Sequence, residues 1–221
     1  MFFFPFKDDN PTKTSPIISY IIIFICCLIY LFQSSLSQNE EFFLIKNYGA
    51  TPILLMNQTV SYWYSSISSM FLHGGLMHLL FNMFGVWMFG AKLEQIWGPK
   101  RFLQFYFFSA LGAFLLHFGI VYFQIQEVIG SVDPQDFQTM LSEGRDILMS
   151  GQNYQGSLGA LNANYNVPVL GASGALFGIL VAFAIYWPNT ELYLMFIPIP
   201  IKAKYAVIGY AAYELFSGIS G

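Results

Sequence analysis

Long apolar runs alternate with polar segments along this chain, and five of the runs are long enough to cross a lipid bilayer. A bilayer core of about 30 Å requires roughly 20 helical residues. The expected spans are residues 16–32, 76–93, 102–123, 169–187 and 204–217, the last preceded by a further apolar stretch. Lipid offers the backbone no water to bond, so each span is expected to be a helix. The pattern therefore predicts an all-α, polytopic membrane helix bundle.

Two long connections separate the spans. Residues 33–75 contain apolar patches that are too short to cross a bilayer, which indicates half-buried elements at the membrane interface. Residues 124–168 are rich in Asn, Gln, Ser, Gly and Asp, a composition typical of a solvated and mobile loop. The predicted organisation is a short cytoplasmic tail, residues 1–15, followed by one membrane domain, residues 16–221.

The composition agrees with a lipid environment. Hydrophobic residues make up 56% of the chain and charged residues 10%, against about 25% charged residues in soluble domains. The formal net charge of −3 gives no indication of nucleic acid as a partner. Cys26 and Cys27 are helical neighbours that point in different directions, so no disulfide is expected between them. A cleaved signal peptide over residues 1–37 is disfavoured, because its apolar run is long for such a segment.

The positions of the basic residues predict the orientation. With a cytoplasmic N-terminus, seven of the nine Lys and Arg residues lie inside: Lys7, Lys13, Lys92, Lys100, Arg101, Lys202 and Lys204. Only Lys46 and Arg145 then lie outside. Cytoplasmic loops carry an excess of Lys and Arg, so this orientation is favoured. It makes both long connections extracytoplasmic.

Polar residues inside membrane helices are costly and often functional, and one such cluster is Gly171-Ala172-Ser173-Gly174. It lies at the outer start of the fourth span. Glycine permits tight turns and close approach, and free N–H groups at a helix start can stabilise an anion. Ser173 could attack a carbonyl while that helix end binds the oxyanion. The alternative is helix packing, which small residues four apart, such as Gly174 and Gly178, commonly support.

The other cluster combines His73, His78 and Asn82. His78 and Asn82 are four residues apart and share one helical face, so both side chains could donate hydrogen bonds toward one point. A zinc site is disfavoured, because His73 and His78 are five apart and no His-Glu-x-x-His arrangement is present. The remaining alternative is that these polar groups only bond to neighbouring helices.

In combination, His73-x4-His78-x3-Asn82 and Gly171-x-Ser173-Gly174 resemble the signature of the rhomboid intramembrane serine proteases. The likeness covers roughly residues 60–221 and includes Glu94-x-x-Trp97-Gly98, Arg101 and the Pro-Ile-Pro-Ile-Lys sequence of residues 198–202. It implies a six-helix bundle, of which five spans are present. It also implies an endopeptidase in the lipid bilayer that cleaves transmembrane protein substrates near the extracytoplasmic face, with no metal and no cofactor.

The resemblance also implies roles for individual residues. Ser173 matches the nucleophile, and His78 and Asn82 match the side chains of the oxyanion hole. His73 matches a structural histidine that anchors the first outer loop, and the supporting residues are Gly171, Gly174 and Phe177. Phe177 matches an aromatic residue that packs against the catalytic histidine. Residues 33–75 would form a membrane-embedded loop, and residues 124–168 are longer than the family leads one to expect.

The family's general base, a histidine on a sixth helix, has no match in this sequence. A serine hydroxyl is a poor nucleophile at neutral pH without a base. His73 and His78 already have implied roles. His117 in the third span could reach Ser173 if the helices adjoin, but an isolated histidine in a span more often pairs with a neighbouring helix. Residues 1–221 are therefore expected to be a fragment that ends before the sixth helix and does not cleave by itself.

Two other functions remain as alternatives. A rhomboid-like protein could bind membrane helices without cutting them, although Ser173, His78 and Asn82 together favour the protease. A transporter needs charged or broken helices along a path at the membrane midplane, whereas Glu94 and Glu214 lie near the ends of their spans. The expected location is a bacterial inner (plasma) membrane.

Overall fold

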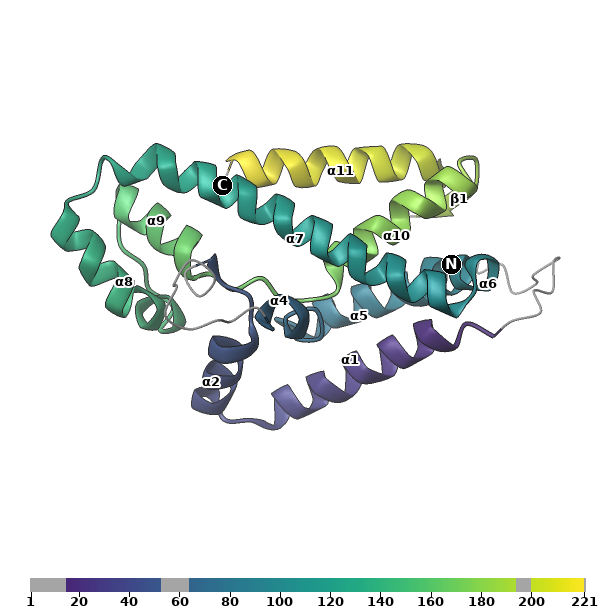
Figure 1. Cartoon of the computed structure of the whole chain (residues 1–221), viewed down its shortest axis with the longest axis horizontal. Coiled ribbons are helices and arrows are strands. Elements are labelled where there is room, and N and C mark those ends of the chain that lie inside the picture. The colour runs from purple at the N-terminus through teal and green to yellow at the C-terminus, as the bar shows by residue number, and fades with distance from the viewer. Residues whose placement is uncertain (1–14, 53–63, 194–199, 221) are drawn as a thin grey trace. The chain divides into compact units, whose positions relative to one another are not determined.

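The computed structural model describes residues 15–52, 64–193 and 200–220, with side chains described up to residue 212 (Figure 1). The predicted cytoplasmic tail, residues 1–15, thus lies almost wholly outside the described residues, as do residues 198 and 199 of the motif before the fifth span. Helices dominate the described chain. The predicted fold class, an all-α membrane helix bundle, is confirmed.

The described helices, in chain order, are α1 (Ile17–Ser35), α2 (Gln38–Tyr48), α4 (Ser65–Ser68), α5 (Leu76–Gly85), the π-helix η1 (Val86–Gly90), α6 (Ala91–Trp97), α7 (Pro99–Ile129), α8 (Pro134–Met149), α9 (Gly156–Asn166), α10 (Ser173–Tyr186) and α11 (Ala203–Ser220). Strands β1 (Glu191–Tyr193) and β2 (Pro200–Lys202) form a short antiparallel pair between α10 and α11. Leu192 is paired with Ile201 in this register.

Three described stretches are long and apolar enough to cross a membrane: Ile17–Ser35, Leu76–Trp97 and Pro99–Ile129. They correspond to the first three predicted spans, and the second consists of α5, η1 and α6 in direct succession. Helices also form over the last two predicted spans, with 14 residues in α10 and 18 in α11. At 1.5 Å per residue, α10 is about 21 Å long, which is shorter than the bilayer core. The chain is a multi-pass integral membrane protein.

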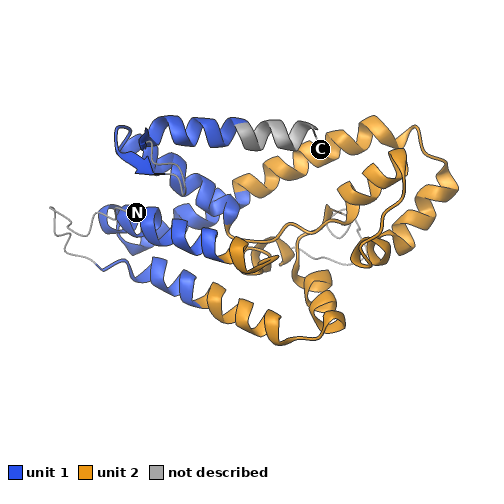
Figure 2. Ribbon diagram, turned by 180° about the vertical axis from the view of Figure 1, so that it is seen from behind, with its two compact units in different colours: residues 1–24, 80–111, 173–221 blue, residues 25–79, 112–172 orange. Residues whose placement is uncertain are grey.

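The chain divides into two compact units (Figure 2). Unit 1 comprises residues 1–24, 80–111 and 173–221, and unit 2 comprises residues 25–79 and 112–172. Helices α1, α5 and α7 each contribute residues to both units. The two sequence clusters are divided as well: Asn82 and Ser173 belong to unit 1, whereas His73 and His78 belong to unit 2.

In unit 1, α5 and η1 pack along α10. A Cβ atom at Gly85 would lie only 2.6 Å from Leu176 Cδ1, so the contact leaves no room for a side chain. Further along both helices, the rings of Phe89 and Phe183 meet edge to face with their centroids 4.8 Å apart. Residue numbers rise together from the first contact to the second, so the two helices run parallel. Small residues permit such close approach of membrane helices.

A buried carboxylate caps the first membrane helix of unit 1. Glu94, in α6, is 1% exposed. Its Oε1 accepts a hydrogen bond from the Ile18 amide at 2.8 Å, and its Oε2 accepts from the Ser19 amide at 2.8 Å and the Ser19 hydroxyl at 2.7 Å. The first N–H groups of a helix have no partner within it, and negative charge is favourable there. Glu94 therefore holds the start of α1 against α6.

Replacing Glu94 by alanine is expected to lower the free energy of unfolding by at least about 3 kcal/mol, because three buried donors lose their acceptor. Glu94→Gln keeps one acceptor oxygen and is expected to cost less. Thermal unfolding in one fixed detergent measures both, with the exposed Glu127→Ala as the matched control. A Glu94→Ala protein as stable as the control would contradict this role.

Residues 124–168 do not form the mobile loop that their composition indicates. Helix α7 continues to Ile129, and α8 and α9 occupy most of the remainder. They enclose a buried apolar cluster of Val121, Ile125, Met140, Leu161 and Tyr165, all in unit 2. The apolar residues are few but lie on facing sides of the helices, so a small core forms despite the polar composition.

Local capping and a buried amide explain how this polar segment becomes helical. The Asp133 carboxylate accepts a hydrogen bond from the Gln135 amide at 2.8 Å, and Pro134 occupies the first helical turn of α8. Both features favour a helix start. Asn162, which is fully buried, donates from Nδ2 to the Gly144 carbonyl at 2.9 Å. Its polar side chain thus joins α8 and α9 from inside the unit.

Candidate active site

Helix α10 begins at Ser173, so the candidate nucleophile occupies the first helical position. The amides at a helix start have no carbonyl partner within the helix, and together they form the positive end of its dipole. The Ser173 side chain is exposed, and its hydroxyl makes no hydrogen bond within the described part of the chain. Ser173 thus combines an exposed hydroxyl with a position at the electropositive start of a helix.

The segment that leads into Ser173, residues 167–171, is extended and is tied to unit 2; we name it the approach segment. Val169 forms an isolated antiparallel bridge with Ala50, and the Gly171 amide donates to the Ser69 carbonyl at 2.8 Å. Gly171 has a φ of 103°, a backbone conformation that side-chain-bearing residues rarely adopt. The motif glycine two residues before the serine is therefore required by the turn.

Asn82 supplies a hydrogen-bond donor that no described residue uses. It lies on α5, is 3% exposed, and its Nδ2 has no hydrogen-bond partner among the described residues. A buried donor without a partner costs about 1–3 kcal/mol and is rare in folded proteins. Such a group needs an explanation, and one explanation is a ligand atom that it binds during function. His78 lies one turn earlier on the same face of α5 and is half-buried.

The parallel packing of α5 and α10 relates Asn82 to Ser173 within unit 1. Asn82 lies three residues before Gly85, and Ser173 lies three residues before Leu176, the two residues that touch across the helix pair. Residues three apart share a helical face. Both residues therefore lie on the N-terminal side of this contact, toward the same end of the helix pair.

His73 is 1% exposed and is fixed by the end of α1. The Gln33 side chain accepts from the His73 amide at 3.1 Å and donates to the His73 carbonyl at 3.2 Å. The ring Nδ1 lies 3.3 Å from the Phe71 carbonyl, which can only accept, so Nδ1 carries the proton. Nε2 has no partner among the described residues. The ring also meets that of His78 edge to face, with centroids 5.2 Å apart.

Burial and the neighbouring His78 lower the pKa of His73 from 6.5 to about 4, although its bond to Phe71 opposes that change. Between pH 6.5 and about 4, this histidine is protonated in the unfolded state but not in the folded state. Its contribution to the free energy of unfolding is therefore fully present above pH 6.5 and is lost as the pH falls toward 4. The loss is expected to approach about 3 kcal/mol. Thermal unfolding from pH 7.5 to 4.5 measures it, and His73→Asn should flatten the curve. Equal pH dependence in both proteins would contradict the assignment.

The other residues singled out from the sequence make contacts of their own, outside the Ser173 and Asn82 positions. In unit 1, Phe177 packs against Tyr210 of α11, with ring centroids 5.9 Å apart, and Gly174 is half-buried. Gly178 packs tightly against Ser109 of α7, which supports the packing interpretation for that glycine. His117 is exposed on α7, in unit 2. Across the described residues, no three His, Cys, Asp or Glu side chains gather into a group that could hold a metal ion.

Two buried polar residues that make long-range hydrogen bonds were not singled out from the sequence. Gln33 is 1% exposed and stands at the end of the first apolar run, and Ser19 is fully buried near the start of that run. A polar side chain within or beside a membrane span is the available signal. It does not name the partner, because His73 follows Gln33 by 40 residues and Glu94 follows Ser19 by 75.

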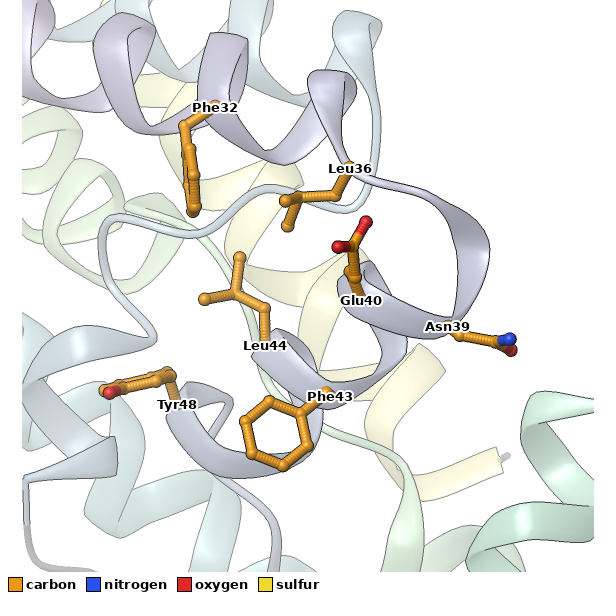
Figure 3. Close-up of a pocket in the computed structure, with 7 residues that line it drawn as sticks. All are labelled: Phe32, Leu36, Asn39, Glu40, Phe43, Leu44 and Tyr48. Carbon is orange, nitrogen blue, oxygen red and sulfur yellow. The ribbon is translucent and has the colours of Figure 1, made fainter.

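An open apolar pocket lies in unit 2 between the end of α1 and α2 (Figure 3). Its lining consists of Phe32, Leu36, Asn39, Glu40, Phe43, Leu44 and Tyr48, and its volume is about 370 Å³. The Glu40 carboxylate is engaged by the Ser37 amide at 2.9 Å and the Ser37 hydroxyl at 2.6 Å. No nucleophile and base pair lines this pocket, so it is not the candidate catalytic site.

Comparison with known proteins finds similarity to the rhomboid family. The model of the Rhomboid domain matches residues 60–126. The chain is similar to "Rhomboid protein 1, mitochondrial" of Saccharomyces cerevisiae, with 26% identity over 73% of this chain and 36% of the relative. It is similar to "Rhomboid-like protein 16, chloroplastic" of Arabidopsis thaliana, with 22% identity over 81% of this chain and 48% of the relative. A putative rhomboid protease of Bacillus subtilis is 41% identical over 20% of this chain and 22% of its own length.

No solved structure matches the chain. The helix bundle and the paired His–Asn and Gly-x-Ser-Gly motifs define a polytopic membrane protein with a candidate serine site. The family-model match and the curated relatives support a rhomboid family protein. It spans between about a third and a half of the length of the first two relatives.

Proposed function

We propose that this protein is an intramembrane serine endopeptidase that cleaves transmembrane proteins near the extracytoplasmic membrane face. The observation that carries the proposal is the Asn82 amide, a buried donor without a partner among the described residues. It lies toward the same end of the α5–α10 pair as Ser173, whose side chain is exposed at the start of α10. Acyl transfer requires a nucleophile and a hydrogen-bond donor for the oxyanion, and these two residues supply one of each. The similarity to rhomboid proteins supports the same reaction.

In the proposed mechanism, the Ser173 Oγ attacks the carbonyl carbon of the scissile peptide bond. Its proton passes to a general base and later to the leaving amine. The carbonyl oxygen becomes an oxyanion, which the Ser173 backbone amide, the Asn82 amide and the His78 ring stabilise by donating hydrogen bonds. Water then hydrolyses the acyl-enzyme by the same route. Low local dielectric strengthens these interactions relative to water.

We propose that the general base lies outside residues 1–221, because none of the three histidines is placed for the role. His73 is buried and bonded to Gln33 and Phe71. His78 shares a helical face with Asn82 and is assigned to the oxyanion. His117 is exposed on α7, and an isolated histidine in a membrane span more often pairs with a neighbouring helix. Residues 1–221 alone are therefore expected not to cleave.

The proposed substrates are membrane helices that unwind locally near their outer ends, since helical hydrogen bonds otherwise shield the peptide bond. The proposed orientation has the N-terminus in the cytoplasm, from the distribution of Lys and Arg. The bacterial inner (plasma) membrane stays a prediction. Two relatives bear names that place them in a mitochondrion and a chloroplast, and the bacterial relative matches 44 residues.

A cleavage assay with the full-length protein tests this proposal. The protein is reconstituted in vesicles with a panel of single-span reporter substrates, and products are sized by mass spectrometry. The proposal predicts cuts near the outer end of the span that persist in the presence of a metal chelator. Stable binding of the helices without any cut across the panel would instead favour the non-cutting, helix-binding protein. Loss of cleavage on chelation would favour a metal enzyme.

A further inference from the structure

The α8–α9 hairpin, residues 134–166, has no part in the proposed chemistry, yet it makes specific contacts with the C-terminal end of α2. The Arg145 guanidinium donates to the Lys46 carbonyl at 2.8 Å and to the Ile45 carbonyl at 3.4 Å. Beside it, the Lys46 ammonium lies 3.5 Å from the Asp146 carboxylate. All of these residues belong to unit 2. The hairpin therefore binds the C-terminal end of α2, within the connection 33–75.

The hydrogen bonds of Arg145 hold the end of α2 more strongly than the ion pair between Lys46 and Asp146 does. The last carbonyls of a helix have no intrahelical partner and form the negative end of its dipole. A guanidinium there makes charge-assisted hydrogen bonds, and Arg145 is half-buried. The side chains of the ion pair between Lys46 and Asp146 are 43% and 62% exposed, so this pair contributes little. Arg145 is thus the residue that fixes the end of α2 to the hairpin.

The residues directly after α2 hold the approach segment. The Ala50 amide donates to the Val169 carbonyl at 3.3 Å, and the Val169 amide donates to the Ala50 carbonyl at 2.7 Å. At Gly49, residues 168 and 170 pack so closely that a Cβ atom would lie 3.1 and 3.0 Å from their side chains. A continuous series of contacts therefore runs from Arg145, through the end of α2, to the segment that leads into Ser173.

We propose that the α8–α9 hairpin positions the nucleophile, with Arg145 as the positioning residue. This inference rests on the proposed function, which gives Ser173 a reacting role. The approach segment is neither helical nor part of a sheet, and Gly171 gives it additional backbone freedom. Its geometry therefore depends on ties from outside. A nucleophile must be held to within about 0.5 Å of its reactive position. The hairpin fixes the end of α2, and Ala50, just beyond that end, bonds the approach segment.

Hydrogen exchange and serine reactivity, measured on the full-length protein, test this role together. In Arg145→Ala, amide exchange in peptides covering residues 167–172 is expected to rise about tenfold or more, because the charge-assisted hydrogen bonds to the Lys46 and Ile45 carbonyls are lost. The rate at which a fluorophosphonate labels Ser173 is expected to fall by about tenfold or more, because a misplaced nucleophile reacts slowly. Arg145→Lys keeps the charge but not the planar fork, so it should recover only part of both.

Asp146→Asn is the matched control, because it breaks the ion pair and leaves the Arg145 bonds in place. It is expected to change both measurements by less than about twofold. Faster exchange in Arg145→Ala with no labelling of Ser173 in any protein would support the positioning contact and refute the protease. Unchanged exchange at residues 167–172 in Arg145→Ala would overturn the inference. Equal effects in Asp146→Asn and Arg145→Ala would also overturn it.

Discussion

Ser173→Ala is expected to abolish cleavage of a transmembrane substrate by the full-length protein. The hydroxyl is the proposed nucleophile, and removing a catalytic serine typically lowers kcat by at least about 10⁴-fold. Substrate binding should persist, because the oxyanion donors and the membrane surfaces that contact the substrate are unchanged. The fold should also persist, since the side chain is exposed and its hydroxyl makes no hydrogen bond within the described residues. Quantified product formation in reconstituted vesicles measures this result.

Ser142→Ala is the control for that experiment. Ser142 is an exposed serine of α8 whose hydroxyl donates only to the Thr139 carbonyl at 2.8 Å. Its replacement should leave the rate unchanged. Cleavage by Ser173→Ala at the wild-type rate would show that Ser173 is not the nucleophile. The candidate would then be a different residue, and the motif at the start of α10 would retain only its packing role.

Asn82→Ala is expected to lower kcat by about 10²–10³-fold with little change in KM. Removal of one oxyanion-hole donor typically has this effect, because the bond is made to the transition state more than to the substrate. A second readout separates this role from a structural one. Nδ2 has no partner among the described residues, so its loss breaks no hydrogen bond within them. Thermal unfolding should therefore change little while catalysis falls.

Asn47→Ala is the matched control for this substitution. Asn47 lies in α2, and its Nδ2 donates to the Phe43 carbonyl at 2.7 Å at an exposed position. Its activity should equal that of the wild type. A rise in KM without a fall in kcat for Asn82→Ala would assign the amide to substrate binding. A large loss of thermal stability would assign it to the structural core.

The sequence predicts those parts of the fold that depend on local periodicity. The first three membrane spans follow from apolar length, and the shared face of His78 and Asn82 follows from their spacing on a helix. The exact start of α10 at Ser173 could not be read in this way, because the apolar run begins several residues earlier, near Val169. The approach segment interrupts that run through its bridge to Ala50, a partner distant in sequence.

Long-range pairing accounts for the other differences. The buried carboxylate of Glu94 bonds the start of α1 across 75 residues, and Gln33 bonds His73 across 40. A polar residue in an apolar run reveals that a partner is needed but does not identify it. The α8–α9 hairpin was not predicted from the sequence for a different reason. Its small core is built from few apolar residues within a polar segment, so composition outweighed the helix-start signal of Asp133 and Pro134.

The central claim is that Ser173 is an activated nucleophile, and identification of a covalent adduct tests it most directly. The full-length protein, in vesicles at neutral pH, is treated with a fluorophosphonate probe, digested and sequenced by tandem mass spectrometry. The account predicts one modified residue, Ser173, and no modification after heat denaturation, because an unassisted serine does not react at this rate. An unmodified Ser173 in a protein that cleaves its substrate, or an adduct on another residue, would contradict the account.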